Sequence, residues 1–266
     1  MTAELQYIVA TGEKPRSYMY EPPPGVPKIS ASYEPHRSVI RSLRPISQLL
    51  SLDAEGFRLV NHRSEVQDFY SDDEVRERHY PEVEKLVAQV AGAARVVVFD
   101  HTVRSRREGV ELVPGRVRRE PVPRVHNDYT VKSGPQRVRD LLAEEAETLL
   151  RRRFSIINVW RPIRGPLEDA PLALADAQSV AFEDLIATDL LYTDRTGETY
   201  NLRHNPAHRW FYAPRMSRDE VLLFRSYDSS TDGRARFVPH AAFEDPTAPA
   251  NALPRESIEL RTLVFY

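Results

Sequence analysis

The sequence predicts a mainly β fold of the α+β class, a jelly roll or sandwich supported by N-terminal helices. Short apolar segments separated by turn signals fill the chain after residue 153, whereas two amphipathic helical patterns lie before it. The 266 residues are 41% hydrophobic and 29% charged, a composition typical of a globular protein with a buried core. We therefore expect a single domain (1–266) with an extended arm (1–50), a supporting part of helices and strands (51–153) and the main jelly-roll strands (154–266).

The first part of the chain is expected to form the arm, one helix and one strand. Residues 1–50 are rich in proline and show no sustained periodicity, which predicts loop and edge strand. Ser71 and Glu74 have the spacing of a capping box, and Pro81 then opens a helix that Gly92 ends. Its apolar residues recur at helical spacing at Val83, Leu86, Val87 and Val90. The apolar run at 95–100 predicts a strand that is covered on both faces.

A second helix and the main strands are expected further along. The helix begins near Ser133, with Pro135 in its first turn, and ends in the arginines at 151–153, where the helix dipole favours cations. Its apolar stripe consists of Val138, Leu141, Leu142, Ala146, Leu149 and Leu150. The strands expected after the helix are 154–161, 198–202, 209–213, 220–226, 236–240 and 257–265.

Charge, hydropathy and cysteine content exclude several classes of protein. The chain has 37 Lys and Arg against 39 Asp and Glu, a net charge of −2, which argues against a dedicated nucleic-acid binder. No apolar run approaches the roughly 20 residues of a membrane span, and the N-terminus lacks a basic n-region, so a cytoplasmic protein is expected. Because there is no cysteine, disulfides, Cys-ligated zinc, iron–sulfur clusters and thiol nucleophiles are excluded.

The chemistry must therefore come from histidine, carboxylate, arginine or hydroxyl groups. Among the histidines, only His126 is followed by a carboxylate residue two positions later, Asp128. Residues i and i+2 of a strand point to the same face, so His126 and Asp128 can converge on one ion. A third ligand is expected on a later strand. Two histidines and one carboxylate would leave open positions on Fe(II), as in non-heme oxygenases.

The candidates for the third ligand are His204, His208 and His240, and His240 is the best placed because it ends the expected strand 236–240. His204 and His208 are interpreted as surface turn residues around Pro206. Asp100 and His101 are neighbours on a strand and point to opposite faces, so they cannot chelate one ion together.

The last strand offers a cation for a carboxylate cosubstrate. Arg255 and Ser257 share a strand face, and an arginine fork suits the far carboxylate of 2-oxoglutarate. Glu259 and Arg261 continue the same face, which predicts a wet or ligand-filled interior; the alternative is an exposed edge strand with a Glu259–Arg261 pair.

Seven segments support a family resemblance over most of the chain. They are 52–57 (LDAEGF), 66–70 (VQDFY), 99–102 (FDHT), 126–129 (HNDY), 158–163 (NVWRPI), 239–243 (PHAAF) and 255–261 (RESIELR). The chain resembles the fungal and bacterial family of Fe(II)/2-oxoglutarate-dependent oxygenases that includes gibberellin desaturase-like proteins and the cephamycin 7α-hydroxylase component. The resemblance implies a double-stranded β-helix (jelly roll) and a hydroxylase or desaturase that uses Fe(II), 2-oxoglutarate and O2 in secondary metabolism.

The resemblance also implies roles for single residues. His126, Asp128 and His240 would be the iron ligands, and Arg255, assisted by Ser257, would anchor 2-oxoglutarate. Arg261 is the alternative anchor, and Asn158, Trp160 and Arg161 lie on a strand expected to line the pocket and contact cosubstrate or substrate.

Other functions stay open at this point, and the substrate is defined only as a small molecule. A cupin-like metal-dependent isomerase or lyase would use the same ligands without Arg255, and an inactive barrel would serve as a partner protein. Arg41, Arg44, Arg104 and the basic stretch 116–119 are candidates for the pocket mouth, which would favour a carboxylated substrate.

Overall fold

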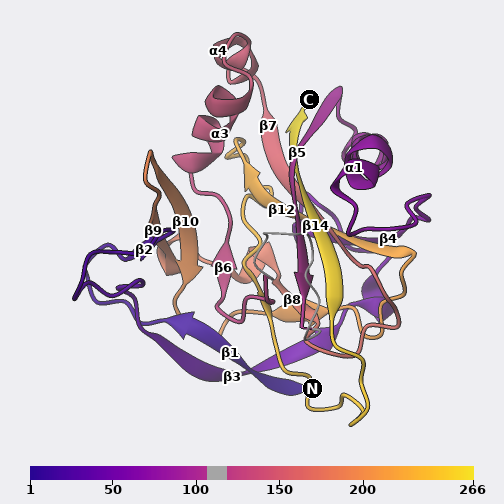
Figure 1. Ribbon diagram of the computed structural model, residues 1–266, viewed down its shortest axis with the longest axis horizontal. Helices are drawn as coiled ribbons and strands as arrows, with labels where there is room; N and C mark the ends of the chain where they lie inside the picture. Colours follow the sequence, from indigo (N-terminus) through magenta and orange to yellow (C-terminus); the bar gives the residue numbers. More distant parts are fainter. Residues whose placement is uncertain (107–118) are drawn as a thin grey trace.

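The computed structural model describes residues 1–106 and 119–266, which form two β-sheets with few helices, the mainly β jelly-roll architecture that the sequence predicts (Figure 1). The major sheet, in spatial order, consists of β1 (Thr2–Ile8), β3 (Tyr33–Ser42), β11 (Trp210–Tyr212), β8 (Leu172–Ala175), β13 (His240–Ala242), β6 (His126–Asn127), β10 (Thr196–Leu202), β9 (Leu185–Leu191) and β2 (Arg16–Tyr18). The minor sheet consists of β4 (Phe57–Asn61), β12 (Glu220–Asp228), β7 (Phe154–Pro162), β14 (Glu256–Phe265) and β5 (Arg95–Ser105). In the view of Figure 1, β6 runs between β10 and β14.

The helices are short and lie outside the sheets. They are α1 (Asp72–Glu74), α2 (Tyr80–Ala91), α3 (Ser133–Leu141) and α4 (Ala146–Leu149), with a π-helical turn at Val75–His79 and 3-10 turns at Arg44–Ile46, Ala177–Ser179 and Phe182–Asp184. Figure 1 shows α3 and α4 at the top of the molecule and α1 at its right-hand side.

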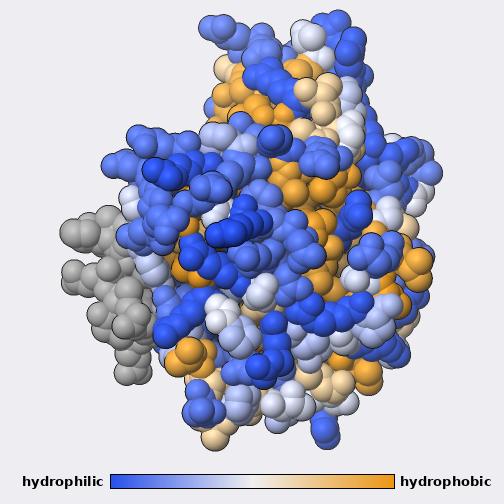
Figure 2. Space-filling view, turned by 90° about the vertical axis from the view of Figure 1, so that its right-hand side faces the viewer, coloured by the Kyte–Doolittle hydropathy of each residue, from blue (hydrophilic) through white to orange (hydrophobic). Residues whose placement is uncertain are grey.

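The first expected helix is confirmed as α2. Ser71 accepts a hydrogen bond from the backbone N–H of Glu74, and Gly92 ends α2 in the left-handed conformation at φ 64°. The buried side chains Val83 and Val87 join one apolar cluster with the outer face of the minor sheet. That side of the molecule is mostly hydrophilic at its surface, with hydrophobic residues gathered in its upper half (Figure 2).

The second expected helix is broken. α3 ends at Leu141, because Leu142 leaves the helical region at φ −129°, and the chain turns before α4 begins at Ala146. Val138 and Ala146 are both buried in one apolar cluster that also contains Phe154 and residues of β12 and β14. The apolar stripe therefore reaches the core as two short helices at different angles.

The arm and the strand boundaries also differ from the expectation. The arm contains β1 and β3, which pair with each other, and β3 continues into the major sheet by parallel pairing with β11. Residues 236–239 are not a strand, and β13 begins only at His240. β8 and β9 were not predicted from the sequence; β8 is four residues of Leu and Ala, too short for a periodic signal.

The inner face of the minor sheet is polar, as predicted for the last strand. Arg261 of β14 lies opposite Asp100 of β5 and Asn158 of β7, and Glu259 lies opposite Thr102 in the next row. The alternate residues of β14, Ile258 and Leu260, pack in the cluster with α2. This alternation places a row of charged and amide groups beside β6.

Candidate metal centre

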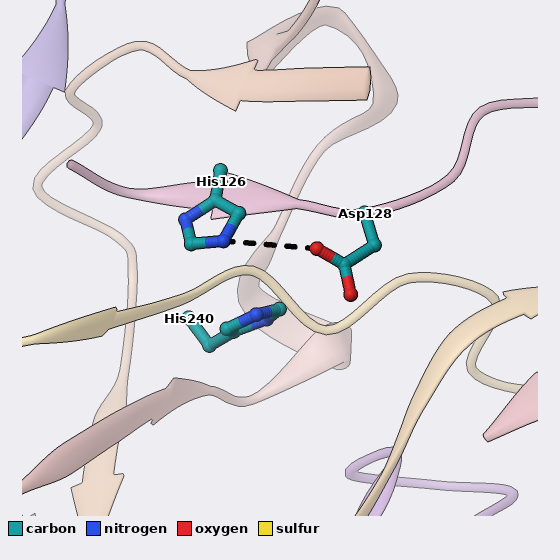
Figure 3. Close-up of side chains that lie close together, drawn as sticks. All are labelled: His126, Asp128 and His240. Atoms are coloured by element: carbon teal, nitrogen blue, oxygen red, sulfur yellow. Dashed lines mark ion pairs between the residues drawn. The ribbon is translucent and has the colours of Figure 1, made fainter. Parts of the chain in front are cut away.

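His126, Asp128 and His240 meet at the junction of β6 and β13 (Figure 3). The two histidines are register partners of antiparallel strands, and Asp128 directly follows β6. One candidate ligand atom from each residue lies within 4.8 Å of the other two, and His126 Nε2 is 3.7 Å from Asp128 Oδ1. The structure thus brings together the three residues that the sequence analysis expected to share one ion.

Both imidazoles are oriented by backbone carbonyls. His126 Nδ1 lies 2.8 Å from the carbonyl oxygen of Arg124, and His240 Nδ1 lies 3.0 Å from that of Val238. A carbonyl only accepts, so each Nδ1 must donate, which leaves the lone pair on Nε2. Burial lowers the pKa of His126 to about 4, with a further contribution from His240, and burial also lowers the pKa of His240. Both side chains are therefore neutral, as metal ligands must be, at neutral pH.

The carboxylate of Asp128 is held on one side. Its Oδ2 accepts hydrogen bonds from Asn158 Nδ2 at 2.7 Å and from Arg261 Nε at 3.0 Å. Burial alone would raise the pKa of Asp128, but the guanidinium of Arg261, the two imidazoles and the Asn158 bond hold it well below its usual range. Asp128 is therefore ionised.

Asn127, between the candidate ligands His126 and Asp128, was not predicted from the sequence to be a site residue. Its side chain is fully buried and donates to the carbonyl oxygens of Tyr129 (2.7 Å) and Ser226 (2.8 Å). Its Oδ1 accepts from the backbone N–H of Val238 at 3.1 Å, two residues before His240. One amide therefore ties both ligand segments together. Strand alternation could have identified Asn127, because the residue between two candidate ligands on one strand face must point to the opposite face.

Arg255 lies beside the triad, and its side chain bonds to neutral acceptors in the described part of the chain. It is 2% exposed, its Nε donates to Ser257 Oγ at 3.0 Å, and its Nη1 donates to the carbonyl oxygen of Ala170 at 2.8 Å. Among the described residues, no carboxylate forms an ion pair with Arg255. Burial lowers the pKa of Arg255 to about 9, so the side chain is still a cation at neutral pH.

A small hollow connects this cation to the triad. It is lined by His126, His240, Arg255, Trp160 and Glu259, among others, and has a volume of about 20 Å³. A five-carbon diacid fits there only with a shift of side chains or by extending into the adjoining large cavity.

Arg261 has a different environment from Arg255. Besides Asp128, it donates to Glu259 Oε1 at 2.5 Å and to Asp100 Oδ2 at 3.1 Å. Three carboxylates therefore surround its guanidinium. The expected alternative, Arg261 as cosubstrate anchor, would require these bonds to break.

The structure does not bring Arg161 to the centre. Arg161 follows Trp160 on β7 and so lies on the opposite face from Asn158 and Trp160. Its Nη2 donates to the carbonyl oxygen of His62 at 2.9 Å, and its guanidinium lies over the ring of Phe69.

The other histidines and Asp100 also lie apart from the triad. His208 Nε2 is 3.2 Å from Asp184 Oδ2 and its side chain is 1% exposed, so it is buried rather than on a surface turn as expected. His204 stacks on His36 with ring centroids 3.8 Å apart. Asp100 and His101 diverge to different partners, as predicted from their alternation.

A large cavity of about 610 Å³ opens beside the triad and shares His126 and Arg104 with the small hollow. Eight lysine and arginine side chains line it against four carboxylates, so it is cationic in a chain of net charge −2. Tyr18 and Tyr33 of the arm contribute to its wall, a role that the sequence analysis did not assign to the arm.

Only part of the expected basic set lies at this cavity. Arg104 and Arg119 line it, whereas Arg41 does not and Arg44 binds Glu220 with both Nη atoms. Residues 116–118 of the basic stretch lie outside the described residues.

The donor set fits Fe(II). Two neutral imidazoles and one ionised carboxylate, already oriented by neighbouring groups, are the ligands of non-heme iron sites that keep positions open. The nearby buried cation is suited to a second, anionic ligand.

Comparisons with known proteins agree with this chemistry. The family model described as "Oxidoreductase/YMDC permease-like domain" matches residues 5–265. The hydroxylase/desaturase efuI of Hormonema carpetanum is 34% identical over 254 residues, which span 88% of this chain and 85% of that protein. The Fe(II)/2-oxoglutarate-dependent dioxygenase nvfI of Aspergillus novofumigatus is 31% identical over 257 residues, 93% of this chain and 90% of that protein.

A solved structure of the iron and alpha-ketoglutarate-dependent endoperoxidase NvfI is also similar. It superimposes with a TM-score of 0.90 and 29% identity, over 100% of this chain and 97% of that one.

No helix in the described ranges is long and apolar enough to cross a membrane.

Proposed function

The chain belongs to the family of Fe(II)/2-oxoglutarate-dependent dioxygenases, and from this membership we propose that His126, Asp128 and His240 bind the iron. The enzyme uses Fe(II), 2-oxoglutarate and O2 and acts on a small molecule. We propose that it hydroxylates or desaturates an unactivated carbon in secondary metabolism, as the printed names of its relatives suggest for them.

When bound, iron would hold and activate O2, and 2-oxoglutarate would supply two of the electrons that this activation needs, so that O2 can oxidise an unactivated C–H bond. The protein's own residues supply the rest. His126 and His240 present Nε2 lone pairs, Asp128 presents a carboxylate oxygen, and the buried Trp160 excludes water beside Arg255. Asn127 keeps the segments that carry both histidines in register.

We assign the cosubstrate anchor to Arg255, with Ser257 in support. The observation that carries this assignment is a buried guanidinium that has no ion pair in the described part of the chain and lies in one hollow with both histidines. A cupin-like isomerase or lyase would have no use for such a cation, and an inactive barrel would need neither the cation nor the oriented imidazoles. Both alternatives are therefore less well supported.

We further propose that the substrate carries a carboxylate. Arg104 and Arg119 line the large cavity, and no carboxylate within residues 1–106 or 119–266 forms an ion pair with either of them. Burial lowers the pKa of Arg104, because desolvation disfavours its charged form. A panel of carboxylic acids and their methyl esters tests this: the acids should raise the release of succinate from 2-oxoglutarate, and equal stimulation by the esters would contradict the proposal.

The ligand assignment is tested by metal content. Apoprotein is reconstituted anaerobically with Fe(II), desalted and analysed for iron. We expect the unaltered protein to retain iron and His240→Ala to lose it. His204→Ala is the matched control, because His204 stacks on His36 away from the triad and its loss should leave the iron content unchanged. Full iron retention by His240→Ala would contradict the assignment.

Three finer points belong to the same proposal. The seven sequence segments favour a relationship to the gibberellin desaturase-like and cephamycin 7α-hydroxylase-like members. The pairing of β3 with β11, and of β5 with β14, supports a single oxygenase domain in which the arm is part of the fold. A cytoplasmic location is compatible with the lack of disulfides.

A further inference from the structure

The two oxygens of Asp128 have different surroundings. Oδ2 accepts hydrogen bonds from Asn158 Nδ2 (2.7 Å) and Arg261 Nε (3.0 Å). Oδ1 has neither bond and lies 3.7 Å from Nε2 of His126. One oxygen is thus held by the protein and the other faces the candidate metal position.

Both donors are themselves held in place. The Oδ1 of Asn158 accepts from Ser226 Oγ at 3.0 Å, and the side chain is fully buried. Arg261 donates through Nη2 to Glu259 and through Nη1 to Asp100 and Thr102. Neither donor can turn away from Asp128 without breaking other bonds, so the arrangement is organised before any metal binds.

The register of the minor sheet explains why the two donors meet. Asn158 of β7 and Arg261 of β14 are directly paired, so both point from the same row of the inner face. The guanidinium of Arg261 also neutralises Glu259, which lines the small hollow, and Asp100, which lines the large cavity. It thus joins the walls of both cavities to the carboxylate of Asp128.

We propose that Arg261 and Asn158 are positioning residues that make Asp128 a one-oxygen ligand. They occupy Oδ2 and leave Oδ1 for the metal. A carboxylate that bound through both oxygens would take one more coordination position on the metal. The hydrogen bonds from Asn158 and Arg261 therefore keep that position free for cosubstrate or oxygen. This inference rests on the proposed function, because it takes the triad as the iron site.

The test uses Co(II) as a redox-stable probe, titrated into the apoprotein and followed by its visible d–d absorption. Asn158→Leu removes the donor at nearly constant volume, and Arg261→Lys keeps the charge but loses the fork that contacts several carboxylates at once. Each variant should weaken Co(II) binding by about 10- to 100-fold, the usual effect of losing a group that orients a ligand. Each should also change the d–d spectrum, because a freed carboxylate alters the coordination number.

One graded variant and one control variant distinguish positioning from general loosening. Ser226→Ala removes the support of Asn158 but not its bond to Asp128, so it should weaken Co(II) binding less than Asn158→Leu does. Arg161→Lys is the control, because it alters an equally buried arginine of β7 that points to the other face of the sheet. It should bind Co(II) with the affinity and spectrum of the unaltered protein.

The outcomes separate the inference from the proposed function. If the unaltered protein binds no Co(II), the assignment of the metal site fails. If it binds Co(II) and Asn158→Leu and Arg261→Lys bind it equally well with the same spectrum, the positioning role is overturned. A loss of the same size in Arg161→Lys would also overturn it, because the effect would then come from the fold.

Discussion

Replacing Arg255 with methionine should weaken 2-oxoglutarate binding and have little net effect on the stability of the fold. A guanidinium has five N–H donors, and the structure gives Arg255 one bond to Ser257 and one to Ala170, so donors remain for a ligand carboxylate. Losing a hydrogen bond to a charged group costs about 1.5 to 3 kcal/mol. At about 1.4 kcal/mol per factor of ten, the dissociation constant should rise about 10- to 150-fold.

The same substitution should change the stability of the metal-free protein only slightly, because two effects oppose each other. It removes a buried charge, but it also removes the donor of the buried Ser257 hydroxyl and of the Ala170 carbonyl oxygen. Arg255 is buried, has no ion pair in the described ranges, and its pKa is lowered to about 9 by burial, so its charge opposes folding. Methionine keeps an unbranched apolar stem but is shorter than arginine, whose guanidinium carbon lies 4.9 Å from the centre of the Trp160 ring. Urea unfolding of apoprotein measures this part of the prediction.

The assay compares two ligands by anaerobic titration of the Fe(II) protein. 2-Oxopentanoate has the keto acid of 2-oxoglutarate but lacks the far carboxylate, so it should bind Arg255→Met and the unaltered protein equally. Ser257→Ala, which removes only a neutral acceptor of Arg255, should cost about 0.5 to 1.5 kcal/mol for 2-oxoglutarate. An equal loss for both ligands in Arg255→Met, or no loss for either, would refute the anchor assignment.

Three further predictions concern the triad, its support and the helical side of the fold. Asp128→Ala should abolish hydroxylation and iron retention; retained turnover would count against its role as ligand. Asn127→Ala leaves three buried backbone groups unpaired, and each should lower the free energy of unfolding by about 1 to 3 kcal/mol. Urea unfolding measures this loss, and an unchanged urea midpoint would contradict it. Burial alone would raise the pKa of Glu82, but hydrogen bonds from His79 and Ser64 hold it at about 2, against 4.5 for a free side chain. The carboxylate therefore stabilises the fold above about pH 4.5, and this contribution is lost as the pH falls towards 2. Between pH 6 and pH 3 the urea midpoint should fall more in the unaltered protein than in Glu82→Gln. An equal decrease of the midpoint in both proteins would refute the lowered pKa of Glu82.

The local part of the site was predictable from the sequence because strand geometry is local. The spacing of His126 and Asp128 places both on one face of a strand, and the alternation of Glu259 and Arg261 with apolar residues places the charges inside. The same rule, applied to Trp160 and Arg161, would have excluded Arg161, which lies on the outer face of β7.

The rest depends on contacts between distant segments. Nothing in the sequence near Arg261 indicates that Asp128, 133 residues away, is its partner, and so the choice between Arg255 and Arg261 stayed open. The break between α3 and α4 was likewise not predicted, because the apolar stripe runs continuously through it, and the residues of both helices pack in one cluster with β12 and β14.

The central claim is that His126, Asp128 and His240 hold an iron to which 2-oxoglutarate binds. The most direct measurement is an anaerobic titration of apoprotein with Fe(II) and then 2-oxoglutarate, followed by the weak visible charge-transfer band of the bound keto acid. We expect the band in the unaltered protein and its absence in His126→Ala. Iron binding without a band, or the same band in His126→Ala, would contradict the claim.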